Sequence, residues 1–371
     1  MIKRKLFVVI PVVGAGGGAA KFVGHLINNL NETKYDIYLV VNKIDTLDAF
    51  RVPPHVKMIH LKVRRSRYAV LFLILAIWKK KPDVVLTTMG YLNLLVATLR
   101  FLLPKDTVVI ARETNTVSVK NQYQERPWLF DALYRLFYKR LDKIVCQSRY
   151  MSEDLNVNFK VPISRLTVIN NPADEAAIDV ATEGVKERAG RLVCMGRLSH
   201  QKGYDMLLEA LALMTIPCEV EIFGVGPELT ALEKNARQLG VDGRVSFMGH
   251  TPHAYRELAS AHAMLLPSRY EGLPNAVIEA HFCGVPVVAF DCPGGVSELI
   301  VDGENGFLVE KEDVQGFAHA VSSALRHDFD RQKIRCTARA RYALAGIMTQ
   351  YEDLIDSTTR HSGSPMPTTF R

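Results

Sequence analysis

Short apolar runs rich in Val and Ile, each followed by a polar or helix-like segment, recur along this sequence. In the first half these runs lie at residues 5–13, 37–43, 56–63, 83–89, 107–113, 143–148 and 166–170. Several are apolar at almost every position, which is typical of strands buried on both faces of a parallel sheet. Amphipathic segments such as residues 19–30 separate several of the runs and place their apolar side chains on one helical face. This alternation predicts a doubly wound α/β domain.

The second half repeats the plan. Its apolar runs lie at residues 191–196, 218–224, 245–249, 263–268, 285–290 and 306–309, with helical patterns at 205–214, 228–240, 276–283 and 314–327. A chain of 371 residues is long enough for two such domains. We therefore predict an N-terminal domain over 1–172, a C-terminal domain over 173–345, a helix over 346–360 that packs back on the first domain, and a disordered tail over 361–371. Ligands of such sheets bind at the carboxyl ends of the strands, so we expect a site in a cleft between the domains.

Charge is unevenly distributed between the two halves. Residues 1–170 contain 27 Lys and Arg against 12 Asp and Glu, whereas the remainder contains 19 against 27. A basic half favours an anionic partner such as a membrane surface or a phosphorylated substrate. No nucleic-acid-binding module is recognisable and the basic residues flank aliphatic runs, so we do not expect nucleic acid.

The six cysteines form no C-x-x-C pair, and most lie inside apolar runs. We therefore expect buried, reduced thiols, which favour a cytoplasmic location or the cytoplasmic face of a membrane. The N-terminal apolar run ends in glycines without a cleavage pattern, and we predict no signal peptide.

The loop "GAGGGAAK" at residues 14–21 partly matches the glycine fingerprint of dinucleotide-binding proteins. That fingerprint also requires an acidic residue at the end of the second strand, where this chain has Asn42 and Lys43. An NAD-dependent oxidoreductase is therefore a weak alternative.

A second loop, at residues 267–275, carries more specific chemistry. A predicted strand ends near Ser268, a helix begins near Asn275, and the carboxylates of Glu271 and Glu279 lie eight positions apart. The free N–H groups of a helix start bind anions, and a carboxylate can accept hydrogen bonds from two neighbouring hydroxyls of a sugar. On spacing alone, Glu279 could equally be a solvated helix residue.

This segment resembles the donor-site signature of the retaining glycosyltransferases of family 4, which have the GT-B fold. The resemblance rests on "EGLPN", "CGVPVVA", the following "GG..E" and "DGENGFLV". It continues upstream through "VINNPAD", "MGRLSHQKGYDMLLEAL" and "IFGVGPELTALEKNARQLGVDGRVSFMGH". It covers almost all of the second half and is looser in the first.

The resemblance implies roles for individual residues. Arg197 and Lys202 would clamp the diphosphate of the donor, where fixed cations stabilise the charge of a leaving group. Glu271 would contact hydroxyls of the transferred sugar, and with these two cations it forms the predicted catalytic set. The predicted donor-binding set, which includes Glu279 as the ligand of the ribose hydroxyls, is Gly17, Gly18, Gly226, Pro227, Gly272, Leu273, Pro274, Asn275 and Glu279.

The first half departs from the family pattern. Many relatives have a histidine where this chain has the polar segment 112–115. We predict acceptor-side candidates there in Arg112, Glu113 and Asn115, with Glu113 as a hypothetical general base. The family is described as using the leaving phosphate to take the proton of the acceptor, so such a base would be unnecessary.

No metal site and no cofactor are predicted. The family handles the diphosphate with cations and a helix end. The single Asp-x-Asp, formed by Asp328 and Asp330, follows a helical pattern rather than a strand, so we interpret it as a solvated helix end.

The segment 63–83 contains an uncharged apolar core from Tyr68 to Trp78, flanked by Arg and Lys on both sides. The core is too short to span a bilayer, which takes about 20 residues. Either the helix is buried on all sides, or it inserts partly into an anionic membrane surface.

Together these features predict a retaining glycosyltransferase that uses a UDP-hexose or UDP-N-acetylhexosamine. The expected acceptor is a hydroxyl of a glycan on a polyprenyl diphosphate, at the cytoplasmic face of the inner membrane. The alternatives are a GDP-mannose-dependent mannosyltransferase, a nucleotide-sugar epimerase with the same fold, and a binding subunit without catalytic activity.

Overall fold

The computed structural model describes residues 3–13, 18–44, 52–61, 63 and 66–360. The chain divides into two compact units. The first unit comprises Met1–Asn170 together with the C-terminal segment from Ala345, and the second comprises Asn171–Leu344. The chain therefore passes from one unit to the other twice, after Asn170 and after Leu344. The predicted tail over 361–371 lies outside the described residues.

The first unit contains a parallel sheet of seven strands in the order β3-β2-β1-β4-β5-β6-β7. The strands are β1 (Arg4–Val13), β2 (Tyr35–Ile44), β3 (Lys57–His60), β4 (Val84–Thr88), β5 (Val108–Arg112), β6 (Lys143–Cys146) and β7 (Leu166–Val168). Leu6 to Ile10 on β1 and all of β4 are buried, because helices cover both faces of the sheet. The continuous apolar runs in the sequence have this origin.

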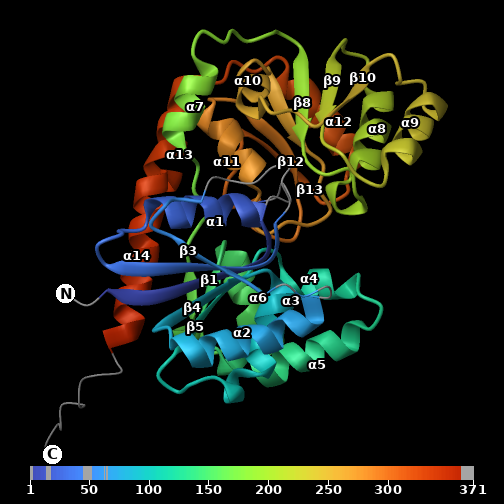
Figure 1. The fold of residues 1–371 in the computed structure, drawn as a ribbon. Helices are drawn as coiled ribbons and strands as arrows, with labels where there is room; N and C mark the ends of the chain where they lie inside the picture. The colour runs from blue at the N-terminus through green and yellow to red at the C-terminus, as the bar shows by residue number, and fades with distance from the viewer. Residues whose placement is uncertain (1–2, 14–17, 45–51, 62, 64–65, 361–371) are drawn as a thin grey trace, which may run out of the picture. The chain divides into compact units, whose positions relative to one another are not determined.

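The helices of the first unit are α1 (Gly18–Asn29), α2 (Ser66–Lys80), α3 (Gly90–Thr98), η1 (Arg100–Leu102), α4 (Val117–Gln122), α5 (Pro127–Phe137), η2 (Tyr138–Arg140), α6 (Arg149–Phe159), η3 (Ile163–Arg165) and α14 (Leu344–Arg360). Side chains from α2, α3, α5 and α6 form one core with Phe7 and Val9 of β1. In Figure 1, α1 lies on the opposite side of this sheet from α2 and α5.

The C-terminal helix α14 completes the first unit. Tyr351 is fully buried, and its ring centroid lies 5.0 Å from that of Phe22 on α1. The Arg112 guanidinium lies over the Phe22 ring at 3.8 Å and interacts electrostatically with Tyr351. At the surface, Lys34 and Glu352 form an ion pair of 2.9 Å. A buried cation that lies over the Phe22 ring and interacts with Tyr351 thus joins β5, α1 and α14.

The second unit contains a parallel sheet of six strands in the order β10-β9-β8-β11-β12-β13. The strands are β8 (Arg191–Met195), β9 (Glu219–Phe223), β10 (Val245–Gly249), β11 (Ala263–Leu266), β12 (Val287–Asp291) and β13 (Gly306–Glu310). The helices are α7 (Glu175–Thr182), η4 (His200–Lys202), α8 (Tyr204–Leu213), α9 (Leu229–Gln238), α10 (Ala254–Ala259), α11 (Asn275–Phe282), α12 (Val314–Ala324) and α13 (Arg331–Tyr342). Helices α8, α9 and α12 cover one face, and α10, α11 and α13 cover the other (Figure 1). The predicted doubly wound architecture is confirmed in both units.

Helix α7 follows the first crossing between the units, and the Asp174 side chain caps its first turn. Two details differ from the sequence-based expectations. Cys336 is exposed, whereas the other five cysteines are buried as expected. Helix α2 is buried on one side only: Leu73 and Ile77 face the core, but Leu75 and Trp78 are more than half exposed. The prediction of a helix buried on all sides is therefore wrong.

Among the helices that the structure describes, none has the length and apolar run that crossing a membrane requires.

Replacing Tyr351 with Ala should lower the free energy of unfolding by about 3–5 kcal/mol, because it leaves a cavity against Phe22 and exposes the buried Arg112 charge. Chemical denaturation followed by circular dichroism would measure this. Leu213→Ala, at a side chain that is 55% exposed, is the control and should change the free energy by no more than about 0.5 kcal/mol. Equal stability of the two variants would contradict the role given to α14.

Candidate functional site

The order of strands in the second sheet determines where its loops can form a site. The chain runs from β8 outward through β9 to β10, then returns to β11 on the other side of β8. The helices that follow β8 and β11 therefore cover opposite faces, and their loops diverge at the carboxyl edge of the sheet. Such a switch point is where doubly wound sheets bind ligands. Arg197 and Lys202 follow β8, and the loop 267–274 follows β11.

Lys202 and Glu271 meet at this switch point. The Lys202 Nζ lies 2.6 Å from Glu271 Oε1, which also accepts a 2.7 Å hydrogen bond from Ser268 Oγ. Both side chains are largely shielded, with 17% and 7% of their surface exposed. A lysine ammonium has three donor hydrogens, so Lys202 can hold Glu271 and still donate to a bound anion. The structure thus brings together two members of the predicted catalytic set.

The position of Lys202 is imposed by the next residue. Gly203 has φ of +64°, and a Cβ at this position would lie 2.0 Å from the carbonyl oxygen of Pro267. The contact is reinforced by Arg269, which donates from its backbone N–H to the Gln201 carbonyl and forms an ion pair with Asp205. These bonds fix η4 against the loop after β11.

The loop 271–275 is held from two sides. Glu271 donates its N–H to the Pro293 carbonyl, and a Cβ at Gly294 would lie 2.4 Å from the Glu271 carbonyl oxygen. On the other side, the Asn171 side chain donates to the Leu273 carbonyl and to Asn275 Oδ1. The backbone of this loop is therefore fixed before any ligand binds.

The predicted donor-binding residues of this loop have different surroundings. Gly272, Leu273 and Pro274 are buried, and Pro274 immediately precedes α11. Asn275 and Glu279 are both partly exposed, and they lie one turn apart on the same face of α11. The first N–H groups of α11 thus emerge beside a carboxylate that remains accessible to a ligand.

Arg197, Gly226 and Pro227 lie in two loops that are bonded to each other. Leu198 donates its N–H to Val225, and a Cβ at Gly226 would lie 2.0 Å from the Leu198 carbonyl oxygen. Arg197 lies in the first of these loops and is exposed. Among the described residues, the ion pair with Glu271 is formed by Lys202 and not by Arg197.

In the first unit, the predicted donor-binding glycines and acceptor-side residues do not share one environment. Gly17 lies outside the described residues, and Gly18 is the first residue of α1. Arg112 is 2% exposed and lies in the core between Phe22 and Tyr351, whereas Asn115 is partly exposed. The arginine therefore contributes to packing, and Asn115 is the more accessible acceptor-side candidate.

Glu113 is buried in a hydrogen-bonded network at the carboxyl edge of the first sheet. Its carboxylate accepts hydrogen bonds from Asn93 Nδ2 at 2.9 Å and from the Tyr138 hydroxyl. Burial raises the pKa of Glu113, opposed by the bond from Asn93 and the nearby charge of Lys120. A Cβ at Gly90 would lie 3.1 Å from Glu113 Oε2, so the network is closely packed. Its role as a general base stays a hypothesis.

Ser268 and Asn171 are site residues that the sequence-based reasoning did not identify. Both lie in segments that carried the family resemblance, "PSRYEG" and "VINNPAD". Their contacts with Glu271 and Asn275 depend on the fold, and no spacing rule could have identified them.

The Asp-x-Asp motif has a structural role. Asp330 caps α13 by accepting a hydrogen bond from the backbone N–H of Lys333, so it lies at the start of a helix rather than at the end of the preceding one. Within the described ranges, no three His, Cys, Asp or Glu side chains are grouped closely enough to hold a metal ion.

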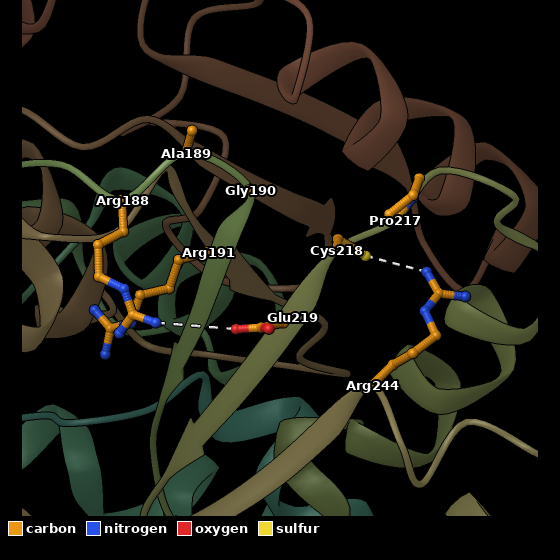
Figure 2. A pocket seen from close by; sticks show the side chains of 8 residues that line it. All are labelled: Arg188, Ala189, Gly190, Arg191, Pro217, Cys218, Glu219 and Arg244. Carbon is orange, nitrogen blue, oxygen red and sulfur yellow. Dashed lines mark hydrogen bonds and ion pairs between the residues drawn. The ribbon is translucent and has the colours of Figure 1, made fainter.

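A pocket of about 450 Å³ lies at the opposite, amino-terminal edge of the second sheet (Figure 2). It is lined by Arg188, Ala189, Gly190, Arg191, Pro217, Cys218, Glu219 and Arg244. Arg191 already forms ion pairs with Glu221 and Glu257, and Arg244 donates to backbone carbonyls. Because its cations are largely neutralised or bonded, this pocket is a poorer anion site than the carboxyl edge.

His281 lies on the buried side of α11, with Nε2 3.2 Å from the Asn305 carbonyl oxygen. Burial lowers the pKa of His281 to about 4, so the folded protein keeps this side chain neutral at neutral pH. The helix that presents Asn275 and Glu279 thus depends on an uncharged imidazole.

Two models of known protein families match this chain, one in each half. The family model described as Glycosyltransferase Family 4 matches residues 16–177, and that of Glycosyl transferases group 1 matches residues 189–327. The chain is 29% identical over 199 residues to the lipopolysaccharide core biosynthesis glycosyltransferase LpsE of Rhizobium meliloti. This match covers 53% of this chain and 58% of LpsE. The chain is 28% identical over 242 residues to a Campylobacter jejuni protein, in a match that covers 63% of this chain and 65% of that protein. The protein is named N-acetylgalactosamine-N,N'-diacetylbacillosaminyl-diphospho-undecaprenol 4-alpha-N-acetylgalactosaminyltransferase. The chain thus spans less than two thirds of the length of these relatives.

Among solved structures, Anabaena Alr3699/HepE in complex with UDP has a TM-score of 0.73 and 18% identity, over 95% of this chain and 100% of that one. At this level of identity the likeness concerns the fold.

Acid should destabilise the second unit through His281. The unfolded chain takes up a proton near pH 6.5, whereas the folded protein resists protonation until about pH 4. Stability is therefore fully present above about pH 6.5 and falls as the pH drops toward 4, by up to about 3 kcal/mol. In His281→Gln, the free energy of unfolding measured by denaturant titration should depend less steeply on pH across this window. An unchanged slope would contradict the assignment.

Proposed function

Because the chain belongs to the glycosyltransferases of family 4 (glycosyl transferases group 1), we propose that it transfers a sugar from a nucleotide-sugar donor to a hydroxyl of a growing glycan. It has the GT-B fold of that family, with one Rossmann-like parallel sheet in each unit. The observation that carries the proposal is the Lys202–Glu271 pair at the switch point of the second sheet.

The pair suits departure of a nucleoside diphosphate. Negative charge builds on the diphosphate as the glycosidic bond breaks, and a fixed cation stabilises it without reorganisation. Lys202 forms an ion pair with Glu271, and Arg197 lies exposed in the same segment after β8. The N–H groups at the start of α11 add partial positive charge from the other loop. Glu271 in turn offers its remaining lone pairs to hydroxyls of the sugar.

The donor in this proposal is a UDP-hexose or UDP-N-acetylhexosamine. Support comes from the fold shared with Alr3699/HepE, whose structure contains UDP. Glu279 would bind the ribose hydroxyls that every such nucleotide presents, so it does not discriminate between bases. GDP-mannose is the alternative donor, and a binding screen with both nucleotides distinguishes them.

The proposed reaction retains the configuration of the sugar. In a front-face reaction the acceptor oxygen attacks from the side on which the diphosphate leaves, and a phosphate oxygen takes the acceptor proton. No protein base is then needed, which agrees with the enclosed position of Glu113.

The proposed acceptor is a glycan on a polyprenyl diphosphate, used at the cytoplasmic face of the inner membrane for cell-surface glycan synthesis. The name of the Campylobacter jejuni relative specifies a diphospho-undecaprenol substrate, and LpsE is named for lipopolysaccharide core biosynthesis. Assaying UDP- and GDP-sugars for thermal stabilisation of the protein, then for transfer to lipid-linked acceptors, tests donor and acceptor separately. Lack of stabilisation by every nucleotide tested would overturn the proposal.

Lys202→Ala should weaken binding of the nucleoside diphosphate product about 10- to 100-fold, since it removes a charge-assisted hydrogen bond. Isothermal titration calorimetry would measure the affinity. Lys333→Ala is the matched control, because Lys333 forms a 3.0 Å ion pair with Glu304 in the same unit but is 60% exposed. Unchanged affinity in Lys202→Ala would remove this residue from the phosphate clamp.

Glu271→Ala should lower the rate of sugar transfer about a hundredfold or more while the protein remains folded, because the bound sugar loses a fixed acceptor. Single-turnover kinetics with the donor identified by the screen measure the rate, and Glu304→Ala serves as the control. Near-normal transfer would contradict the role of Glu271.

Transfer should continue in excess EDTA, because Lys202 and Arg197 supply the positive charge that a metal ion would otherwise provide. The assay compares initial rates with and without EDTA. Loss of activity that Mg²⁺ or Mn²⁺ restores would show that the two cations are insufficient.

A further inference from the structure

Helix α2 presents a row of large apolar side chains to solvent. Leu71, Phe72, Leu75 and Trp78 are 53%, 49%, 64% and 53% exposed, and their spacing places them on one face of the helix. The opposite face is tightly packed, with Leu73 1% and the Ile77 side chain 0% exposed. The helix is therefore anchored in the core, and its outer face is apolar as well.

The short helix η1 extends this row. The Trp78 indole Nε1 donates a 2.8 Å hydrogen bond to the Leu102 carbonyl oxygen, which places the end of α2 beside η1. On η1, Phe101 is 69% and Leu102 39% exposed. We call these six side chains the α2–η1 surface: Leu71, Phe72, Leu75, Trp78, Phe101 and Leu102. Single exposed apolar residues are common, but six on two adjoining helices mark an interaction site.

Positive charge borders this surface. Lys79, Lys80 and Lys81 follow Trp78 directly, Lys105 follows η1, and all four are exposed. Asp83 and Asp106 are the nearest exposed acids in the sequence. Residues 49–82 contain nine Lys and Arg and no Asp or Glu. Apolar side chains bordered by lysines match a bilayer with anionic headgroups, where the apolar groups enter the acyl boundary and the lysines reach the phosphates.

We propose that the α2–η1 surface docks this protein on an anionic lipid bilayer. Leu71, Phe72 and Leu75 insert at the headgroup–acyl boundary, Trp78 lies at the interface, and Lys79 and Lys105 contact lipid phosphates. The proposal rests on the proposed function insofar as a lipid-linked acceptor requires access to a membrane. The tryptophan supports this assignment because indole rings favour the interfacial region.

The chain contains two tryptophans, Trp78 and Trp128, which supply a test with an internal control. Both are exposed, at 53% and 69%, but Trp128 lies on α5 and not on the α2–η1 surface. In the Trp128→Phe protein, vesicles of phosphatidylcholine with phosphatidylglycerol should shift the emission of Trp78 to the blue, and brominated acyl chains should quench it. In Trp78→Phe, the remaining emission should change little. Insertion of Trp128 instead of Trp78 would overturn the proposal.

Flotation with the same vesicles measures the affinity of the full chain. Leu75→Glu should weaken binding about tenfold or more, since it removes an inserted apolar side chain. Lys79→Gln with Lys105→Gln should weaken it about tenfold as well, and only with anionic lipid. Leu213→Glu and the pair Lys186→Gln with Lys234→Gln are the controls, because these exposed side chains belong to the second unit. They should bind as the unmodified protein does.

The outcomes separate this proposal from the proposed function. UDP affinity is measured in parallel and should be the same in every variant, because none lies at the carboxyl edge of the second sheet. Nucleotide binding without vesicle binding would overturn the docking surface alone. Self-association that Leu75→Glu abolishes, without vesicle binding, would show that the surface is an interface between copies of this chain and would also overturn it.

Discussion

The contact between the backbone of Gly203 and the carbonyl oxygen of Pro267 is the constraint on which the candidate site depends. No side chain fits at this position, because a Cβ would lie 2.0 Å from that oxygen. The contact brings the loops after β8 and β11 together, so Lys202 reaches the Glu271 carboxylate. The ion pair between Arg269 and Asp205 holds the same two loops from outside. The Lys202 ammonium is thus positioned both by the backbone of its loop and by its ion pair with Glu271.

Both sheets place ionisable groups at their carboxyl edges, but with opposite accessibility. In the second unit, Arg197 is exposed and Glu279 is partly exposed, so both are accessible to solvent. In the first unit, Glu113 is enclosed by Asn93 and Tyr138. A buried carboxylate with satisfied hydrogen bonds rigidifies its surroundings. Glu113 therefore rigidifies the segment that continues to Asn115.

The sequence was sufficient for the strands, because they follow from local patterns, whereas the grouping of Lys202 with Glu271 was implied by the family resemblance and is accounted for by the sheet topology. Apolar runs reveal buried strands, and residues that follow adjacent parallel strands meet at one edge. Arg112 could not be placed in this way. Its place in the polar segment that replaces the family histidine suggested an acceptor-side residue, but its partners Phe22 and Tyr351 are far away in the sequence. Similarly, α2 is apolar on every face, so periodicity could not show that Leu73 is buried and Leu75 exposed.

The return of α14 to the first unit has a consequence for the order in which the chain can fold during synthesis. Translation delivers residues 1–170 first, but the segment that contains Tyr351 leaves the ribosome only after the whole second unit. The second unit therefore has its complete sequence available before the first does. Until α14 emerges, Phe22 and Arg112 lack Tyr351, which interacts with both of them in the finished protein. The domain that begins first is thus the one that is finished last.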